Sequence, residues 1–534
     1  MSSTITASPV VNNLQGQIED SPAENKKAKP ALPPWKNYQK VLFRIAFIFF
    51  LIITIPLNGE WYKNLFGLDW FHLHYRDLYD VARFSPTLYK FDTPSYNLLG
   101  YIDWLEALAI GIVGGAIWTA IDRNKTKEYN KLYYWLRVIV RYRAGIGIIG
   151  FGFTKLLPTQ MPYPSLGLLN THFGDFTAQK IYWLSVGIVP WYQVFAGVVE
   201  LAAGALLFFR KTTTLGAILL LGALGDITYV NFAYDGGVHV YASYFVLFAA
   251  FLILYDAVPI YNLIIRERFT APFTYYPSFD QKWPKIARIG LKTANIAIFL
   301  VLLFYLQFIN WKYDPYKQPA VKGVSELRGN YKVSEFKIND RIVPYAPLDS
   351  VRWRDVTFEN WSTLTYNVNK PVKLDLSNGG GAAMRDINRT FELTGTGGGK
   401  RVFYYDADTV NKVLYLQDKY VEANRRRGKG AKKPDQKDLV QASFIPAQAL
   451  ANIGNEDKKI DKAALSTRRT RGIAEELKDK RKRNRMILTY NANADGSHIV
   501  LTGKDEKKND VYIVLDRINR KYLLADSKLV AGKY

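Results

Sequence analysis

The sequence predicts a two-part protein: an α-helical membrane bundle of about seven transmembrane helices, followed by an all-β antiparallel barrel or sandwich. Long apolar runs recur between residues 39 and 310, and runs of roughly 20 residues match a bilayer core of about 30 Å. After residue 311, apolar and polar residues alternate in short stretches, as expected of strands. A Lys- and Arg-rich stretch at 418–484 interrupts the strand pattern and predicts a helical or disordered insertion.

Composition divides the chain into three regions. Residues 1–38 are polar and predict a disordered cytoplasmic tail, 39–310 form the membrane domain, and 311–534 form an extracytoplasmic β-domain. The net charge is +24, and residues 311–534 carry +16 of it, from 44 Lys and Arg against 28 Asp and Glu. Most of the positive charge therefore lies outside the membrane domain.

Seven apolar segments predict the membrane helices. A backbone in hydrocarbon must satisfy its own N–H and C=O groups, so each segment is expected to be helical. The predicted helices are 41–57, 98–121, 132–157, 183–209, 215–232, 238–254 and 289–309.

Basic residues are concentrated in alternate connections between these helices. They include Lys36, Lys40, Arg210, Lys211, Arg266 and Lys285, whereas residues 233–237 contain no Lys or Arg. Because positively charged loops stay in the cytoplasm, the N-terminus is predicted to be cytoplasmic. Seven crossings of the inner (cytoplasmic) membrane then leave the β-domain in the periplasm.

The predicted strands have a period of two residues. Alternation is present in 331–338, 351–358, 364–368, 372–376, 499–501 and 511–515. Around ten short strands with polar turns favour an antiparallel barrel or a sandwich.

Two carboxylates lie inside the three central predicted helices at 183–254, Glu200 and Asp226. An intramembrane carboxylate is costly, so it is expected to face the bundle interior and to have a partner. The face of Glu200 carries small or polar residues, which predicts close packing against another helix; they are Gln193, Ala196, Gly197, Ala203 and Gly204. Arg141 and Glu200 each lie about nine residues from the inner ends of their helices, which predicts a buried ion pair between them.

A second group of polar residues is expected near the outer face. Its members are Glu106, Lys155, Asp226, Tyr229, Asn231, Asp235 and His239. A Lys, several carboxylates, a Tyr and a His beneath aromatic residues can hydrogen-bond a quinone head group or another lipid with a polar head. His72 and His74 offer two metal ligands, but the sequence fixes no third. Interfacial histidines without metal are the default interpretation.

Three segments carry a family resemblance. Gly197-x-x-Glu200-Leu201-x-x-Gly204 resembles the Glu-containing helix of DoxX-like membrane proteins. Residues 231–256 are similar to the last helix pair of that family, and 145–156 to its Gly-rich helix ending in Lys-Leu. The resemblance spans about 132–266 and implies membrane-associated redox work or its support, with a quinone as partner. Residues 329–333 resemble the first strand of lipocalin-like barrels.

Other features limit the function classes. DoxX-like proteins are often grouped with thiol-redox and thiosulfate–quinone systems, yet this chain has no cysteine, which excludes thiol chemistry by its own side chains. No nucleophile–base pair, phosphate loop or cofactor fingerprint is present. A non-catalytic lipid-binding or envelope-assembly protein is therefore an equal alternative. The basic insertion is either a solvated segment or a surface for anionic lipid or polyanionic envelope polymer; a nucleic acid partner is not expected.

Overall fold

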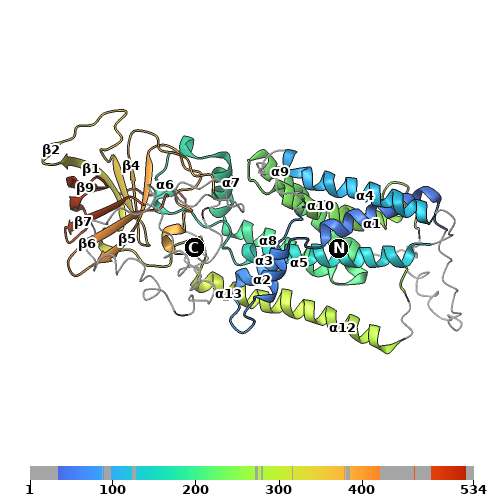
Figure 1. The fold of residues 1–534 in the computed structure, drawn as a ribbon. Helices are drawn as coiled ribbons and strands as arrows, with labels where there is room; N and C mark the ends of the chain where they lie inside the picture. Colours follow the sequence, from blue (N-terminus) through green and yellow to red (C-terminus); the bar gives the residue numbers. More distant parts are fainter. Residues whose placement is uncertain are drawn as a thin grey trace, which may run out of the picture.

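The protein consists of an α-helical bundle with a closed β-barrel at one end (Figure 1). The computed structural model describes residues 34–86, 88, 98–122, 128–270, 275–277, 281–315, 317–377, 379, 385–420, 462 and 483–524. Most of the predicted N-terminal tail and of the basic insertion lies outside the described residues. The division near residue 311 agrees with the helix-to-strand change in the chain.

The bundle is built from long helices that run between the barrel end and the opposite end (Figure 1). The long helices are α1 (Asn37–Thr54), α4 (Ile102–Ile121), α5 (Asn130–Leu156), α8 (Pro190–Leu207), α9 (Thr213–Ala233), α10 (His239–Leu254), α12 (Lys282–Ile296) and α13 (Leu303–Tyr313). A π-helical turn at 297–302 joins α12 to α13. The short helices are α2 (Gly59–Phe66), α3 (Tyr75–Ala82), α6 (Leu166–Leu169), α7 (Ala178–Gly187) and α11 (Ala257–Ile264).

Among the described residues, five helical segments are long and apolar enough to cross a membrane. They are 37–54, 102–121, 190–207, 210–233 and 282–313, and the pair 239–254 and 257–264 is a sixth if its 77° bend lies within one span. The remaining predicted span corresponds to α5, which is 27 residues long. Five charged residues are distributed along α5 and lower its hydropathy: Lys131, Arg137, Arg141, Arg143 and Lys155.

The single helix predicted over 183–209 is instead two helices. The first, α7, ends at Gly187, and α8 begins at Pro190. Proline has no backbone N–H to donate and its ring clashes with the preceding turn, so it is favoured at the start of a helix and ends the one before it. The break could not be predicted from hydropathy, because the residues on both sides of it are apolar and hydropathy carries no information on backbone geometry.

The C-terminal half is a barrel rather than a sandwich. Its strands are β1 (Gly329–Ile338), β2 (Arg341–Ile342), β3 (Asp355–Phe358), β4 (Thr363–Asn367), β5 (Lys400–Asp408), β6 (Val413–Asp418), β7 (Arg485–Ala492), β8 (His498–Lys504) and β9 (Asp510–Arg517). Antiparallel pairing runs from β1 through β3 to β9 in chain order, and β1 pairs with β9. Eight strands are thereby closed, and β2 only extends a hairpin from β1.

Side chains fill the barrel interior. Trp353 stacks on Tyr366 with ring centroids 4.0 Å apart, within one cluster of buried residues contributed by all eight strands of the barrel. The alternation in β1 changes phase between Val333 and Phe336 because the pairing with β9 has a bulge there. The barrel is therefore a packed core.

One predicted strand is absent and others were not predicted. Residues 372–376 form no strand, and Leu376 is exposed. Apolar alternation alone did not reveal that this stretch lacks a partner strand. The strands β5, β6 and β7 were not predicted, and the basic insertion connects β6 to β7.

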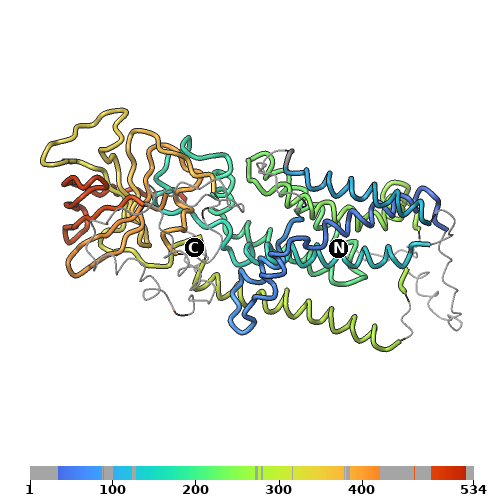
Figure 2. The backbone as a smooth tube through the Cα atoms, viewed as in Figure 1, coloured from blue at the N-terminus to red at the C-terminus, as the bar shows by residue number. Residues whose placement is uncertain are grey.

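The connection between α5 and α8 is docked on the barrel, as the tube in Figure 2 shows. Glu359 of the barrel accepts hydrogen bonds from the backbone N–H groups of Leu166 (3.0 Å) and Gly167 (2.7 Å). Lys400 Nζ donates to the carbonyl of Gly167 (3.2 Å) and to Thr171 Oγ1 (2.5 Å). Burial raises the pKa of Glu359 and lowers the pKa of Lys400 to about 8. A turn between two bundle helices is thus part of the barrel surface.

A second connection anchors the end of α13. Arg389 is fully buried and donates to Asp314 Oδ1 (2.6 Å), which follows α13, while its Nε lies 3.5 Å from Asp386 Oδ1. Asp386 in turn accepts from the backbone N–H groups of Ala320 (2.9 Å) and Val321 (2.8 Å). The barrel is therefore attached to the bundle at two separate points of the chain.

We expect the substitution Arg389→Met to destabilise the protein by about 3–5 kcal/mol, because it removes the cation between two buried carboxylates. Equilibrium unfolding of the full chain in detergent measures this change. The control is Lys504→Met, which removes an exposed ion pair with Asp510 and should leave stability nearly unchanged. Equal effects of the two substitutions would contradict a structural role for Arg389.

Candidate functional site

The site is built on the close contact between α5 and α8. A Cβ atom at Gly197 would lie 2.4 Å from the backbone nitrogen of Leu156, and one at Gly152 would lie 2.7 Å from Leu201 Cγ. Only glycine permits this approach of the two backbones. The contact confirms the predicted packing of the small face of α8, of which all but the half-buried Ala196 are buried.

This contact encloses an ion pair between Lys155 and Glu200. Lys155 Nζ donates to both carboxylate oxygens of Glu200, at 2.7 and 2.8 Å. Glu200 is 1% exposed and Lys155 is 8% exposed. Two charges removed from water are tolerated when they satisfy each other in this geometry.

The predicted pair between Arg141 and Glu200 is wrong. Arg141 donates to Thr213 Oγ1 at 3.3 Å, at the start of α9. The prediction compared how far Arg141 and Glu200 lie from the inner ends of their helices. This comparison failed because α5 is much longer than α8. Gly145 already contacts Phe208, beyond the last residue of α8, so Arg141, one turn earlier on α5, lies past the end of that helix.

A cavity of about 150 Å³ opens beside the Lys155–Glu200 pair, and we call it the junction cavity. It lies at the barrel end of the bundle, where α3, α5, α7, α9, α10 and the residues after α13 meet. Aromatic rings form much of its wall, namely Tyr79, Phe151, Tyr182, Trp183, Tyr241 and Phe245. Trp183 in turn lies 6.4 Å from the ring of Phe391, which belongs to the barrel.

The junction cavity is positively charged. Among its described lining residues, four are cations, Arg76, Arg83, Lys155 and Lys317, and one is a carboxylate, Glu200. Arg76 also pairs at 3.1 Å with Asp80, which does not line the cavity. The ammonium group of Lys317 lies 4.4 Å from the ring centroid of Trp183. Burial, and then the charge of Arg76, lower the pKa of Lys317 to about 7. Its charge therefore changes close to neutral pH.

The structure brings only part of the predicted outer group together. Lys155 and Asn231 line the cavity, and Asn231 Nδ2 donates to the carbonyl of Ile227 at 2.7 Å. The other predicted members do not line it: Glu106 is half-buried on α4, Asp226, Tyr229 and Asp235 are exposed, and His239 is buried between the rings of Tyr101 and Phe232.

Helical geometry explains this division. Leu224, Ile227 and Asn231 share one face of α9 because they are spaced by three and four residues. Asp226 and Tyr229 fall on another face, so closeness in sequence did not place them in the cavity. The cavity residues of α3 were missed because no sequence signal ties that amphipathic helix to α5.

The two histidines considered as weak candidates for metal ligands each have another partner. His72 is exposed and its Nδ1 lies 2.9 Å from Asp69 Oδ2. His74 precedes α3, where its Nδ1 accepts from the backbone N–H of Arg76 at 3.2 Å. In the part of the chain that the structure describes, no three His, Cys, Asp or Glu residues are grouped as metal ligands.

The chain matches no protein-family model, no curated protein and no solved structure. The chemistry of the junction cavity follows from the residues that line it. Among the described lining residues there is no Ser, Thr, Cys or His. Such a lining supplies hydrogen-bond donors, positive charge and aromatic surface.

We expect Lys155→Met to cost about 3–5 kcal/mol, because it leaves the buried Glu200 carboxylate without its cation. The double variant Lys155→Met with Glu200→Gln should recover much of this loss, since neither charge is then left alone. Equilibrium unfolding in detergent measures both, with the exposed Asp226→Asn as a control that should change little. Additive losses in the double variant would contradict the pairing.

Proposed function

We propose that this protein is an integral inner-membrane protein that binds the polar head group of a lipophilic molecule in the junction cavity, and that a quinone is this ligand. The observation that carries the proposal is the lining of the cavity: four cations and one carboxylate among aromatic rings. Such a site favours a flat head group whose oxygens accept hydrogen bonds.

The size of the cavity supports a ring-sized head group. Pockets that enclose a drug-sized ligand have volumes of about 300 Å³ or more, whereas the junction cavity has about 150 Å³. A quinone ring would fit with its isoprenoid tail outside, beside the apolar helices α9 and α10. Its carbonyl oxygens would accept hydrogen bonds from Lys317 and the arginines, and its ring would stack on Trp183 or Tyr79.

The charge distribution supports an orientation with the N-terminus in the cytoplasm and the barrel in the periplasm. The start of α1, the turn between α8 and α9 and the start of α12 lie at the end of the bundle away from the barrel (Figure 1). Basic residues lie in or next to these segments, namely Lys36, Lys40, Arg210, Lys211 and Lys285. Positively charged segments stay on the cytoplasmic side. The junction cavity would then open near the outer leaflet.

Support of quinone-linked redox chemistry is the role that fits the DoxX-like resemblance of residues 145–156 and 197–204. The chain has no cysteine, so electrons would pass between the quinone and a partner protein rather than through a thiol of this chain. The barrel would hold the cavity in shape through its contacts at Trp183 and Asp314.

A second candidate is a non-catalytic lipid-binding or envelope-assembly protein. The absence of Ser, Thr, Cys and His among the described residues that line the junction cavity favours binding over covalent catalysis. In this role the ligand would be a phospholipid head group, and the packed barrel would act as a platform instead of a lipid carrier.

Quinone binding should weaken as the pH rises through about 7. The pKa of Lys317 is lowered to about 7, so its ammonium group donates a charged hydrogen bond at pH 6 and is largely neutral at pH 8.5. A charged hydrogen bond contributes about 1.5–3 kcal/mol, which corresponds to roughly ten- to hundredfold in affinity. Titration of purified protein in detergent with menaquinone or ubiquinone at the two pH values measures the change.

Lys317→Met should bind quinone weakly and without this pH dependence. The matched control is Lys312→Met, because Lys312 is an exposed lysine on α13 that does not line the cavity. Native mass spectrometry of the same samples identifies a lipophile that co-purifies. Phospholipid retained in place of quinone, with the same dependence on Lys317, would favour the second candidate.

A further inference from the structure

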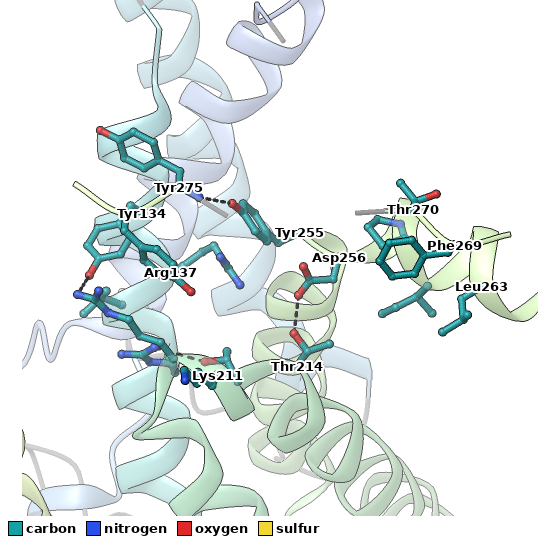
Figure 3. Close-up of a pocket in the computed structure, with 17 residues that line it drawn as sticks. Tyr134, Arg137, Lys211, Thr214, Tyr255, Asp256, Leu263, Phe269, Thr270 and Tyr275 are labelled. Carbon is teal, nitrogen blue, oxygen red and sulfur yellow. Dashed lines mark hydrogen bonds between the residues drawn. The ribbon is translucent and has the colours of Figure 1, made fainter. Parts of the chain in front are cut away.

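A larger pocket lies at the end of the bundle away from the barrel, and we call it the distal pocket. It has a volume of about 450 Å³. The first half of α5, the turn between α8 and α9, the end of α10 and α11 contribute to it, together with Phe269, Thr270, Tyr275 and Tyr276 (Figure 3). It is separate from the junction cavity, since the two share no lining residue.

The distal pocket holds more positive charge than its own residues neutralise. Arg137, Arg141, Arg210 and Lys211 line it, and Asp256 is the one carboxylate among its described lining residues. Among the described residues, no carboxylate lies within 4.0 Å of any of these four cations. The Asp256 carboxylate instead accepts a hydrogen bond from the Thr214 hydroxyl, as Figure 3 shows.

Two of the arginines, Arg137 and Arg141, have a buried N–H group without a hydrogen-bond partner among the described residues. Arg141 is 8% exposed, and its Nε and that of Arg137 are buried without a hydrogen-bond partner among the described residues. The guanidinium of Arg137 lies 3.7 Å from the ring centroid of Tyr255. Buried donors of this kind are normally satisfied, so these two Nε atoms lack an acceptor, and the excess of cations around the pocket favours an anion as the group that binds there.

The remaining polar groups suit a phosphate. Arg210 donates to the Tyr134 hydroxyl and also lies 5.0 Å from the ring centroid of Tyr276, which fixes its planar group at the pocket. Guanidinium groups present paired N–H donors that match phosphate oxygens. One arginine is enough to bind a carboxylate. Three arginines and a lysine match a group with several charged oxygens, such as a phosphate.

The rim of the pocket is apolar on one side. The chain bends by 77° from α10 into α11, and α11 has no buried residue. Leu263 and Phe269 line the pocket, and they are 61% and 84% exposed. A short exposed apolar helix beside a basic pocket is the arrangement that binds a lipid at the membrane surface, with acyl chains on the helix and the head group in the pocket.

We infer that the distal pocket binds the phosphate-bearing head group of an anionic membrane lipid. Arg137, Arg141 and Arg210 contact the phosphate, and α11 contacts the acyl chains. Under the proposed orientation, this lipid belongs to the cytoplasmic leaflet, opposite the junction cavity. The inference stands on the distal pocket alone and does not depend on a quinone ligand.

The test uses the full chain in neutral detergent with added phosphatidylglycerol or phosphatidylcholine, followed by native mass spectrometry and thermal unfolding. Phosphatidylglycerol should bind and raise the unfolding temperature, and phosphatidylcholine should bind at least about tenfold more weakly, because its choline cancels the phosphate charge. The variant Arg141→Gln with Arg210→Gln should lose this preference. The control Arg268→Gln with Lys285→Gln removes two exposed charges that do not line the pocket, and should keep it.

Equal loss in both double variants would overturn the inference, because general surface charge would then explain the binding. Leu263→Gln separates a lipid from free phosphate: it should weaken phosphatidylglycerol binding and leave any binding of inorganic phosphate unchanged. Binding of inorganic phosphate alone, with the same dependence on Arg141 and Arg210, would overturn the lipid assignment. If the arginine double variant fails to fold, the single variant Arg210→Gln replaces it, since Arg210 is only half-buried, and retention of the lipid preference there would also count against the inference.

Discussion

The close contact of α5 with α8 is the constraint on which the rest of the bundle depends. Glycines at 152 and 197 let the two backbones approach, and this approach brings Lys155 Nζ within 2.8 Å of both oxygens of Glu200. A buried carboxylate without this cation would be strongly destabilising. The pair in turn forms one wall of the junction cavity, so the same contact supports both the fold and the site.

Buried charged contacts also join the barrel to the bundle. In the turn that follows α5, the backbone N–H of Gly167 donates a hydrogen bond to Glu359. Asp314, which follows α13, forms an ion pair with Arg389. Both barrel side chains are buried at the junction. The two halves of the chain are therefore joined by charged groups that have lost their water and that would be costly to separate. This explains how residues from opposite halves, such as Trp183 and Lys317, meet in one cavity.

Positive charge has a different character at the two ends of the bundle. In the junction cavity one lysine is neutralised by Glu200, and burial lowers the pKa of Lys317 towards neutrality. In the distal pocket, guanidinium groups remain charged at any physiological pH and lie against tyrosine rings. Both sites contain arginines, but the junction cavity also contains the Lys155–Glu200 pair and a lysine of lowered pKa, so we propose a neutral head group there and a permanent anion in the distal pocket.

The type and approximate position of helices and strands with a strong local sequence pattern could be predicted from the residues alone. Apolar length predicted most of the bundle helices, alternation predicted β1, β4 and β9, and the small face around Gly197 predicted close helix packing. Only the tertiary structure decided the partner of Glu200, the exposure of Asp226 and the closure of the barrel, because these depend on helix register and on strand pairs far apart in the chain. Sequence spacing fixes which residues share a face of one element, but not which other element that face meets.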